Sequence, residues 1–249
     1  MRDSVAGADD AGIDAGMDYR GDAGVEPGAA AFAEEMGYRH RRYGGIGQRE
    51  AAQREAVLAT ANPDKVREIR SILSDSGWRL LDRPASIGEI DETGSTIEEN
   101  ALLKARTVGM LAGTAAIADD TGLEVDALGG RPGVYSSRYA GPDASYYDNV
   151  VALLKEMDAV GAVDVASRGA RFVTVACLWV PVGGSIMATG TVEGIITGSP
   201  RGEGWGYDPI FVPLEGDGRT FAEMEAGEKN AISHRGRAFR ELARKISGY

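Results

Sequence analysis

Between residues 56 and 65 the chain reads Ala56-Val57-Leu58-Ala59-Thr60-Ala61-Asn62-Pro63-Asp64-Lys65. The first half is a short apolar run, which is typical of a buried strand. The second half is typical of a helix start, because asparagine is a good N-cap and proline fits the first helical position. Apolar residues then recur at helical spacing, at Val66, Ile69, Ile72 and Leu73. The stretch therefore predicts a buried strand that runs directly into a helix.

The rest of the chain alternates strand and helix patterns in the same way. Short apolar runs predict strands at residues 80–81, 115–118 and 210–212, the second of them ending in Asp119-Asp120. Residues 171–180 and 185–197 predict a long hairpin around Pro181-Val182-Gly183-Gly184. Periodic apolar positions predict helices over residues 95–111, 145–157 and 230–246. This mixture favours an α/β fold with a mixed central β-sheet flanked by helices.

These three helices carry more specific expectations. Ser95 and Glu98 have the spacing of a capping box at the first helix. The buried faces are expected at Ile97, Ala101, Ala105, Val108 and Ala112 in the first helix, at Val150, Val151 and Leu154 in the second, and at Ile232, Phe239, Leu242 and Ile246 in the third.

The first 53 residues differ from everything that follows. They are rich in Gly, Ala and Asp and show no apolar periodicity. This composition predicts a mostly disordered extension, with a regulatory or docking arm as the alternative. Residues 54–249 are then expected to form one domain.

Composition narrows the class of protein. The formal net charge of −11 disfavours a polynucleotide-binding role, because such proteins usually present a basic surface. No apolar stretch approaches the length of a membrane span, and no secretory signal pattern begins the chain. The single cysteine, Cys177, lies in an apolar run and fits a buried thiol in a reducing compartment. We therefore expect a cytoplasmic protein.

Two segments suggest chemistry on phosphates. The turn from Thr60 to Lys65 brings a helix N-terminus and a lysine together, which favours an anion, although an ordinary turn is the alternative. Asp119-Asp120-Thr121-Gly122 follows an apolar run, and Gly122 is expected to let the chain turn sharply there. Buried carboxylates need a partner, and Mg²⁺ is a common one. Asp91 and Glu92 offer further carboxylates for a shared metal.

Two later segments suggest a binding pocket. Gly202-Glu203-Gly204-Trp205-Gly206-Tyr207-Asp208-Pro209 combines flexible glycines with Trp205 and Tyr207, on whose faces a purine can stack. Lys229, His234 and Arg235 lie near the start of the last predicted helix. The alternatives are a loop whose aromatic residues pack on the core, and a histidine with a structural role.

The order and spacing of these motifs resemble the inosine triphosphate pyrophosphatase family, also called the Ham1 or RdgB family. The resemblance begins near Ala56 and excludes the N-terminal extension. Its motifs are Ala59 to Lys65, Glu99-Asn100-Ala101 with Lys104-Ala105, Ala118 to Leu123, Gly130 to Tyr139, Gly206 to Phe211, and Ser233-His234-Arg235-Gly236.

The resemblance implies a function and a set of roles. It implies hydrolysis of deaminated purine nucleoside triphosphates (ITP, dITP and XTP) to the monophosphate and pyrophosphate, with Mg²⁺, in a homodimer of elongated two-lobed subunits with a central cleft. It implies Asp120 as the base and a metal ligand, and Asp91 as the second metal-side carboxylate unless Glu92 serves instead. The implied substrate-binding residues are Thr60, Ala61, Asn62, Pro63, Asp64, Lys65, Lys104, Thr121, Trp205, Gly206, Tyr207, Asp208, Lys229, His234 and Arg235.

Three departures from the family pattern and two rival functions accompany this interpretation. Ala61 stands where relatives often have glycine, Trp205 where they often have phenylalanine, and Asp91 where glutamate is common. The rival functions are a Maf-type pyrophosphatase that acts on other modified nucleotides, and a nucleotide-binding protein without turnover. A panel of nucleotide substrates separates all three functions.

Overall fold

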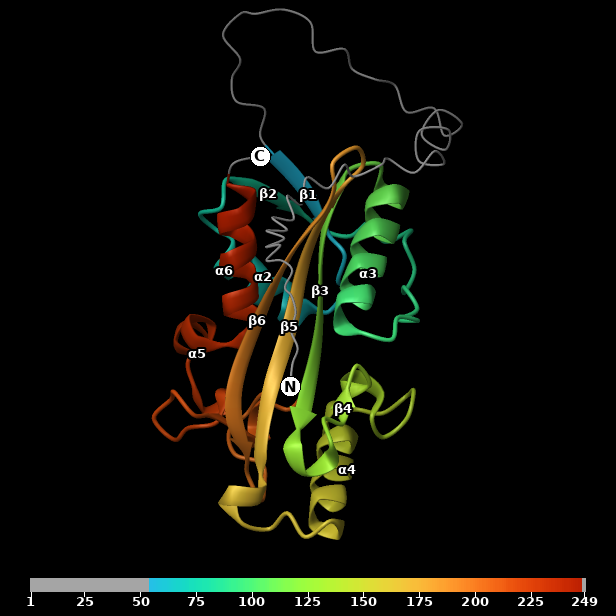
Figure 1. The fold of residues 1–249 in the computed structure, drawn as a ribbon. Helices are drawn as coiled ribbons and strands as arrows, with labels where there is room; N and C mark the ends of the chain where they lie inside the picture. Colours follow the sequence, from blue (N-terminus) through green and yellow to red (C-terminus); the bar gives the residue numbers. More distant parts are fainter. Residues whose placement is uncertain (1–53, 248–249) are drawn as a thin grey trace, which may run out of the picture. The chain divides into compact units, whose positions relative to one another are not determined.

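A computed structural model describes residues 54–247, so the extension predicted for residues 1–53 lies outside the described residues (Figure 1). Within them, seven strands form one sheet in the order β2-β1-β3-β5-β6-β7, and β4 pairs with β3. The strands are β1 (Arg54–Leu58), β2 (Trp78–Leu81), β3 (Ala115–Val125), β4 (Pro132–Gly133), β5 (Gly169–Val180), β6 (Gly184–Ile196) and β7 (Phe211–Pro213). The α-helices are α2 (Pro63–Ile72), α3 (Ile97–Ala112), α4 (Tyr146–Ala159), α5 (Ala226–Ile232) and α6 (His234–Ile246).

The sheet is mixed, as predicted. β1 runs parallel to β2 and β3, whereas β3, β5, β6 and β7 pair antiparallel. Figure 1 shows α3 and α6 on opposite sides of the long strands. Among the described residues, no helix has the length and apolar character that a membrane crossing requires.

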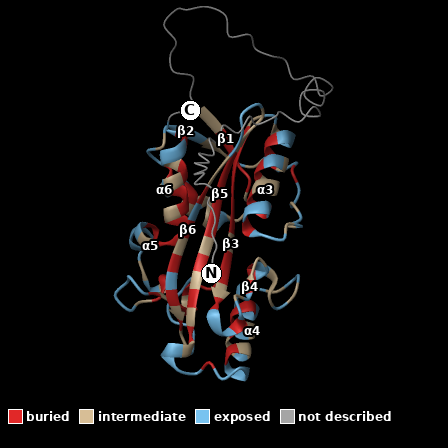
Figure 2. Cartoon of the chain, viewed as in Figure 1, coloured by how far each residue is buried: buried red, intermediate tan, exposed pale blue. Residues whose placement is uncertain are grey.

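The core is divided among three groups of buried residues. In Figure 2 the buried residues, coloured red, run along the central strands. Side chains alternate between the two faces of a strand, so neighbouring residues of β3 join different groups. Ile117 packs with Phe239 and Leu242 of α6, whereas Ala116 packs with Ala105 of α3. A third group lies around α4, with Leu153, Met157, Phe172, Phe211 and Phe221.

The strand after residue 115 is longer than predicted. It does not end at Asp119-Asp120, because pairing with β5 continues without a break from Ala116 to Val125. Gly122 therefore does not make a turn. A Cβ atom there would lie 2.8 Å from the carbonyl oxygen of Gly133, so glycine is needed for the close approach of β4.

Three helix details also differ from the sequence prediction. Thr96, not Ser95, caps α3, because its hydroxyl accepts the Glu99 N–H at 3.1 Å. In α4, Val150 is buried and Leu154 partly buried as expected, but Val151 is exposed and Leu153 is fully buried instead. The predicted last helix is split into α5 and α6 at Ser233, which caps α6 in an extended conformation.

Candidate active site

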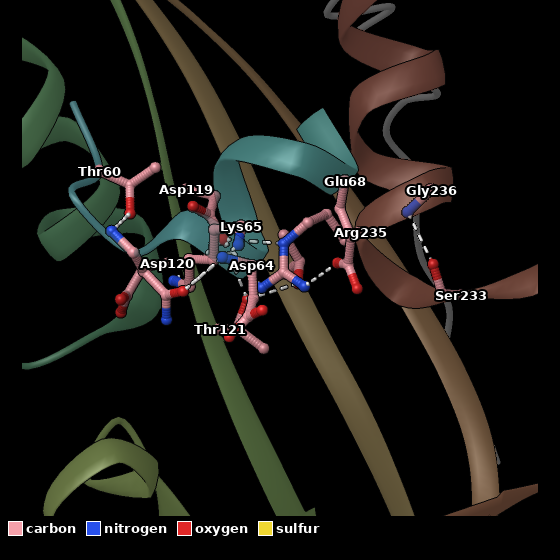
Figure 3. A network of polar contacts seen from close by, with 12 residues as sticks. Thr60, Asp64, Lys65, Glu68, Asp119, Asp120, Thr121, Ser233, Arg235 and Gly236 are labelled. Atoms are coloured by element: carbon pink, nitrogen blue, oxygen red, sulfur yellow. Dashed lines mark hydrogen bonds and ion pairs between the residues drawn. The ribbon is translucent and has the colours of Figure 1, made fainter. Parts of the chain in front are cut away.

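The turn that enters α2 is built by its own side chains (Figure 3). Asn62 Oδ1 accepts the N–H groups of Asp64 at 2.9 Å and Lys65 at 3.4 Å, and the Thr60 hydroxyl accepts the Asn62 N–H. The predicted N-cap is therefore confirmed. Asn62, Asp64, Lys65 and Val66 each donate their backbone N–H to an acceptor within this turn. The charge at this turn comes from Lys65.

Two adjacent carboxylates of β3 face opposite sides of the sheet, as strand alternation requires. Asp119 has a fully buried side chain, and its Oδ2 lies 3.1 Å from Lys65 Nζ and 3.1 Å from Arg235 Nη2. Asp120 Oδ1 lies 2.7 Å from Nζ of Lys104, which comes from α3. Cationic side chains from α2, α6 and α3 therefore lie against the adjacent residues Asp119 and Asp120.

The surroundings push the acidities of these two carboxyl groups apart. Burial opposes the charge of Asp119, yet the cations Lys65 and Arg235 hold the pKa of its carboxyl far below the usual range. Burial raises the pKa of Asp120, and Glu92 adds to the rise although Lys104 opposes it. Asp119 is therefore a permanent anion, whereas Asp120 is the better proton acceptor.

Glu92, rather than Asp91, reaches the site. Asp91 is exposed and makes no side-chain hydrogen bond or ion pair among the described residues. Glu92 Oε1 accepts from Lys104 Nζ at 2.9 Å, and its Oε2 accepts from Arg138 at 2.9 Å. Burial opposes the charge of Glu92, but Lys104 and Arg138 lower the pKa of its carboxyl. The expected place of Asp91 beside Asp120 is therefore taken by Glu92, the alternative that the resemblance left open.

A metal ion would meet two carboxylates here. Within residues 54–247 no cluster of three or more His, Cys, Asp or Glu side chains is suited to a metal. Asp120 and Glu92 nevertheless face the same ammonium group, that of Lys104. Mg²⁺ often takes only one or two carboxylates from a protein and completes its shell with water and substrate phosphates. The donor set is compatible with such an ion.

A second buried charge network joins the far end of the site. Lys229 Nζ lies 2.5 Å from Asp208 Oδ2 and 2.6 Å from Glu68 Oε1. Glu68 Oε2 also accepts from Arg235 at 2.6 Å, and Arg235 donates to the Thr121 hydroxyl at 3.2 Å. Burial opposes the charge of Glu68, but its two cations lower its pKa. Figure 3 shows Arg235 between Glu68 and Thr121.

The aromatic residues of this end play unequal parts. Trp205 is half-buried, and the charged groups of Lys229 and Arg235 each lie 5.1 Å from its ring centroid. Tyr207 is only 5% exposed, and its hydroxyl donates to the Ser136 carbonyl at 2.9 Å. The ring of Tyr207 therefore packs in the core. Of these two aromatic residues, Trp205 is the one whose ring a ligand can contact.

His234 is enclosed. It is 3% exposed, and its ring stacks on Phe172 with centroids 4.3 Å apart. Its Nδ1 is buried without a hydrogen-bond partner. Burial lowers the pKa of His234 well below the usual value, and the nearby Arg235 and Lys229 lower it further, so the ring is neutral at physiological pH.

Most of these residues line one open cavity. Of the residues expected from sequence, its walls include Asn62, Lys65, Asp120, Thr121, Trp205, Gly206, Tyr207, Asp208, His234 and Arg235. Lys104 and Lys229 do not line the cavity themselves, but each forms an ion pair with a residue that does, Lys104 with Asp120 and Lys229 with Asp208. Thr60, Ala61, Pro63, Asp64 and Asp91 do not line it, and the Asp64 carboxylate pairs with Arg67.

Sequence reasoning assigned no role to Glu68 or Arg138, and it considered Asp119 only as a carboxylate for a metal ion. Glu68 and Asp119 are the anions that hold Arg235, and Arg138 holds Glu92. Asp119 carried a signal, since its apolar neighbours implied burial and hence a cation. Glu68 and Arg138 carried none beyond the general polarity of their segments.

Comparison with known proteins places the chain among close relatives. The Ham1 family profile matches residues 56–245. A dITP/XTP pyrophosphatase of Exiguobacterium sp. is 46% identical over 194 residues, which cover 76% of this chain and 95% of the relative. The protein of the same name from Bacillus subtilis is 44% identical over 197 residues, which cover 78% and 97%.

Solved structures agree with this similarity. A HAM1 protein from Coxiella burnetii matches with a TM-score of 0.70 and 39% identity, covering 79% of this chain and 100% of the other. A nucleoside-triphosphatase, also described as a dITP/XTP pyrophosphatase, from Mycobacterium abscessus matches with a TM-score of 0.60 and 40% identity, covering 76% and 97%.

Proposed function

Because this chain belongs to the Ham1 family, we propose that it hydrolyses deaminated purine nucleoside triphosphates, ITP, dITP and XTP, to the monophosphate and pyrophosphate. The names of the relatives support this reaction. The observation that carries it is the pair Asp120 and Glu92 around Lys104, on the wall of a cavity that also contains Trp205. The cavity therefore combines charged groups that can bind a triphosphate with an aromatic face on which a base can stack.

Asp120 is the proton acceptor in this proposal. Its raised pKa brings the carboxylate closer to the operating pH, where a general base is most effective. The oxygen of a water molecule bonds to the α-phosphorus while its proton passes to Asp120. The bond from that phosphorus to the bridging oxygen breaks, and pyrophosphate leaves with the electron pair.

The lysines hold the phosphates. Lys65 and Lys104 approach the two β3 carboxylates from α2 and α3, so their charges lie on either side of the strand. Preorganised cations stabilise negative charge that develops on transferring phosphoryl groups. We propose that Asp120 and Glu92 would hold Mg²⁺, which when bound supplies further positive charge to the phosphates.

Base selection belongs to the other end of the cavity. Lys229 and Arg235 lie against Trp205 and are donors only. A 6-oxo group accepts hydrogen bonds, whereas a 6-amino group donates them. Arg235, which lines the cavity, can therefore donate to the 6-oxo group of hypoxanthine or xanthine but not to the 6-amino group of adenine.

The direct test is pyrophosphate release from ITP, XTP, GTP and ATP, each with Mg²⁺ and with EDTA. We expect metal-dependent release from ITP and XTP and little from ATP. Release from modified pyrimidine or guanine nucleotides instead points to a Maf-type activity. Tight binding of ITP without release points to a nucleotide-binding protein.

Replacement of Asp120 tests the proposed base. Asp120→Asn keeps the size of the side chain but cannot accept the proton, so we expect kcat for ITP to fall by about 10² or more. Glu92→Gln should weaken the activation of turnover by Mg²⁺. Asp91→Asn should change neither kcat nor this activation, because Asp91 is exposed. Near-normal turnover in Asp120→Asn refutes its role.

The assembly and the compartment are proposed on other grounds. The family resemblance supports a homodimer, which size-exclusion chromatography with light scattering tests. A cytoplasmic location is supported by the cysteine count, since a single cysteine, Cys177, cannot form an intrachain disulfide and fits a reducing compartment.

A further inference from the structure

Tyr146 occupies a fixed position at the mouth of the cavity. It is the first residue of α4, and a reciprocal capping box holds the start of that helix. The Ser145 hydroxyl accepts the Asp148 N–H at 3.1 Å, and the Asp148 carboxylate accepts the Ser145 N–H at 2.9 Å. Such a cap fixes the backbone that carries the Tyr146 side chain.

The hydroxyl of Tyr146 reaches the turn that enters α2. Asn62 Nδ2 donates to it at 2.7 Å. The orientation of the Asn62 amide is set, because its Oδ1 already accepts the backbone N–H groups of Asp64 and Lys65. The Tyr146 oxygen is therefore an acceptor in this contact. No group of residues 54–247 accepts its own hydrogen, which is left available to a ligand.

The ring of Tyr146 reaches the opposite end of the cavity. Its centroid lies 5.9 Å from that of Trp205, with the two planes tilted by 48°. Tyr146, Asn62 and Trp205 all line the cavity. One side chain therefore spans the distance between the lysine end, marked by Asn62, and the aromatic end, marked by Trp205.

We propose that Tyr146 faces the sugar of the bound nucleotide and that its hydroxyl donates a hydrogen bond to a sugar hydroxyl. The inference rests on the proposed function, which puts phosphates beside Lys65 and the base beside Trp205. In any nucleotide the sugar joins these two parts, and Tyr146 is the residue that contacts the walls of both. Tyr146 is then a residue that determines selectivity among sugars.

The test compares Tyr146→Phe with wild type on ITP, dITP and 2′,3′-dideoxyinosine triphosphate. The variant keeps the ring but loses the donor. We expect kcat/KM to fall by about three- to tenfold on every substrate that carries the contacted hydroxyl, as for loss of one neutral hydrogen bond. On the dideoxy substrate, which has neither hydroxyl, we expect wild type and variant to be equal.

Tyr147→Phe is the matched control. Tyr147 is the next residue of the same helix, is 70% exposed and does not line the cavity. Its variant should match wild type on all three substrates. If dITP falls as ITP does, the contact is to the 3′-hydroxyl, and if only ITP falls, it is to the 2′-hydroxyl.

Two outcomes overturn the proposal. An equal loss on the dideoxy substrate means that the hydroxyl acts only by holding Asn62, and no loss on any substrate means that it makes no contact. Both differ from failure of the proposed function, in which wild type itself releases no pyrophosphate from ITP.

Discussion

At the scale of single residues, the site depends on groups whose charge state the surroundings impose. Asp119 and Asp120 are chain neighbours, yet the cations Lys65 and Arg235 lower the pKa of the first despite its burial, whereas burial, with Glu92, raises the pKa of the second. His234, a few ångströms from Phe172, is kept neutral. Identical or adjacent residue types therefore perform different tasks because their partners come from different elements.

The neutral His234 makes stability depend on pH. Its pKa is lowered in the folded protein, so the unfolded chain binds a proton below about pH 6.5 when the folded chain does not. The free energy of unfolding should be unaffected by this group above that pH and fall below it. In urea unfolding, wild type should lose about 1 kcal/mol more than His234→Phe between pH 6.5 and 5.5. Equal losses in the two proteins would contradict this.

Local chemistry explains which site residues the sequence could predict. The cap at Asn62-Pro63 uses only groups within three positions, so the sequence predicted it correctly. Asp119 meets Arg235 across 116 positions, and no local pattern encodes that contact. Asp91 and Glu92 are adjacent and both carry a carboxylate, so the sequence does not distinguish them. Only in the fold does Glu92, and not Asp91, contact Lys104.

At the scale of elements, the approach of α6 to β6 places the base end of the site. A Cβ atom on Gly190 of β6 would lie 2.2 Å from the carbonyl oxygen of His234 and 2.4 Å from the N of Ala238. The first turn of α6 therefore lies directly on the strand. Apolar periodicity predicted a helix through residues 230–246 but not its break, because the capping role of Ser233 is invisible to periodicity.

Gly190→Ala should therefore destabilise the protein. The added methyl group meets backbone atoms that cannot rotate away, so we expect a loss of about 1–3 kcal/mol in the free energy of unfolding. Gly227→Ala is the control, since that glycine lies in α5 with nothing within 4 Å of the added methyl. It should be neutral or stabilise by up to about 1 kcal/mol. Equal effects of the two substitutions in urea unfolding would refute the contact.

At the scale of the whole described domain, one partly buried glutamate joins elements that are distant in sequence. Glu68 of α2 binds Lys229 of α5 and Arg235 of α6, and Arg235 in turn binds Asp119 in the middle of the sheet. The α/β class and most of the elements followed from sequence, but β4 and the division of the last helix into α5 and α6 did not. The way α2, α5 and α6 converge on β3 did not, because it depends on ion pairs between segments that no periodicity relates.

Glu68→Ala should cost far more than an ordinary surface ion pair. It leaves two buried cations short of a partner, and the loss of one member of a buried pair typically costs about 3–5 kcal/mol. Glu55→Ala breaks the exposed pair with Arg79 and should cost about 0–1 kcal/mol. Urea unfolding of both variants checks this, and similar midpoints for the two would show that the buried network contributes little.

The 116 positions between Asp119 and Arg235 also have a consequence in time. At ordinary rates of synthesis, Asp119 is made roughly 6 to 23 seconds before its partner. Throughout that interval the growing chain lacks Arg235, so the base end of the cavity is incomplete. A product of stalled or interrupted translation that stops short of residue 235 therefore keeps Lys65 and Lys104 for Asp119 and Asp120 but lacks the Arg235 cation. Such a fragment should be a substrate for cellular proteases, not a nucleotide-consuming enzyme.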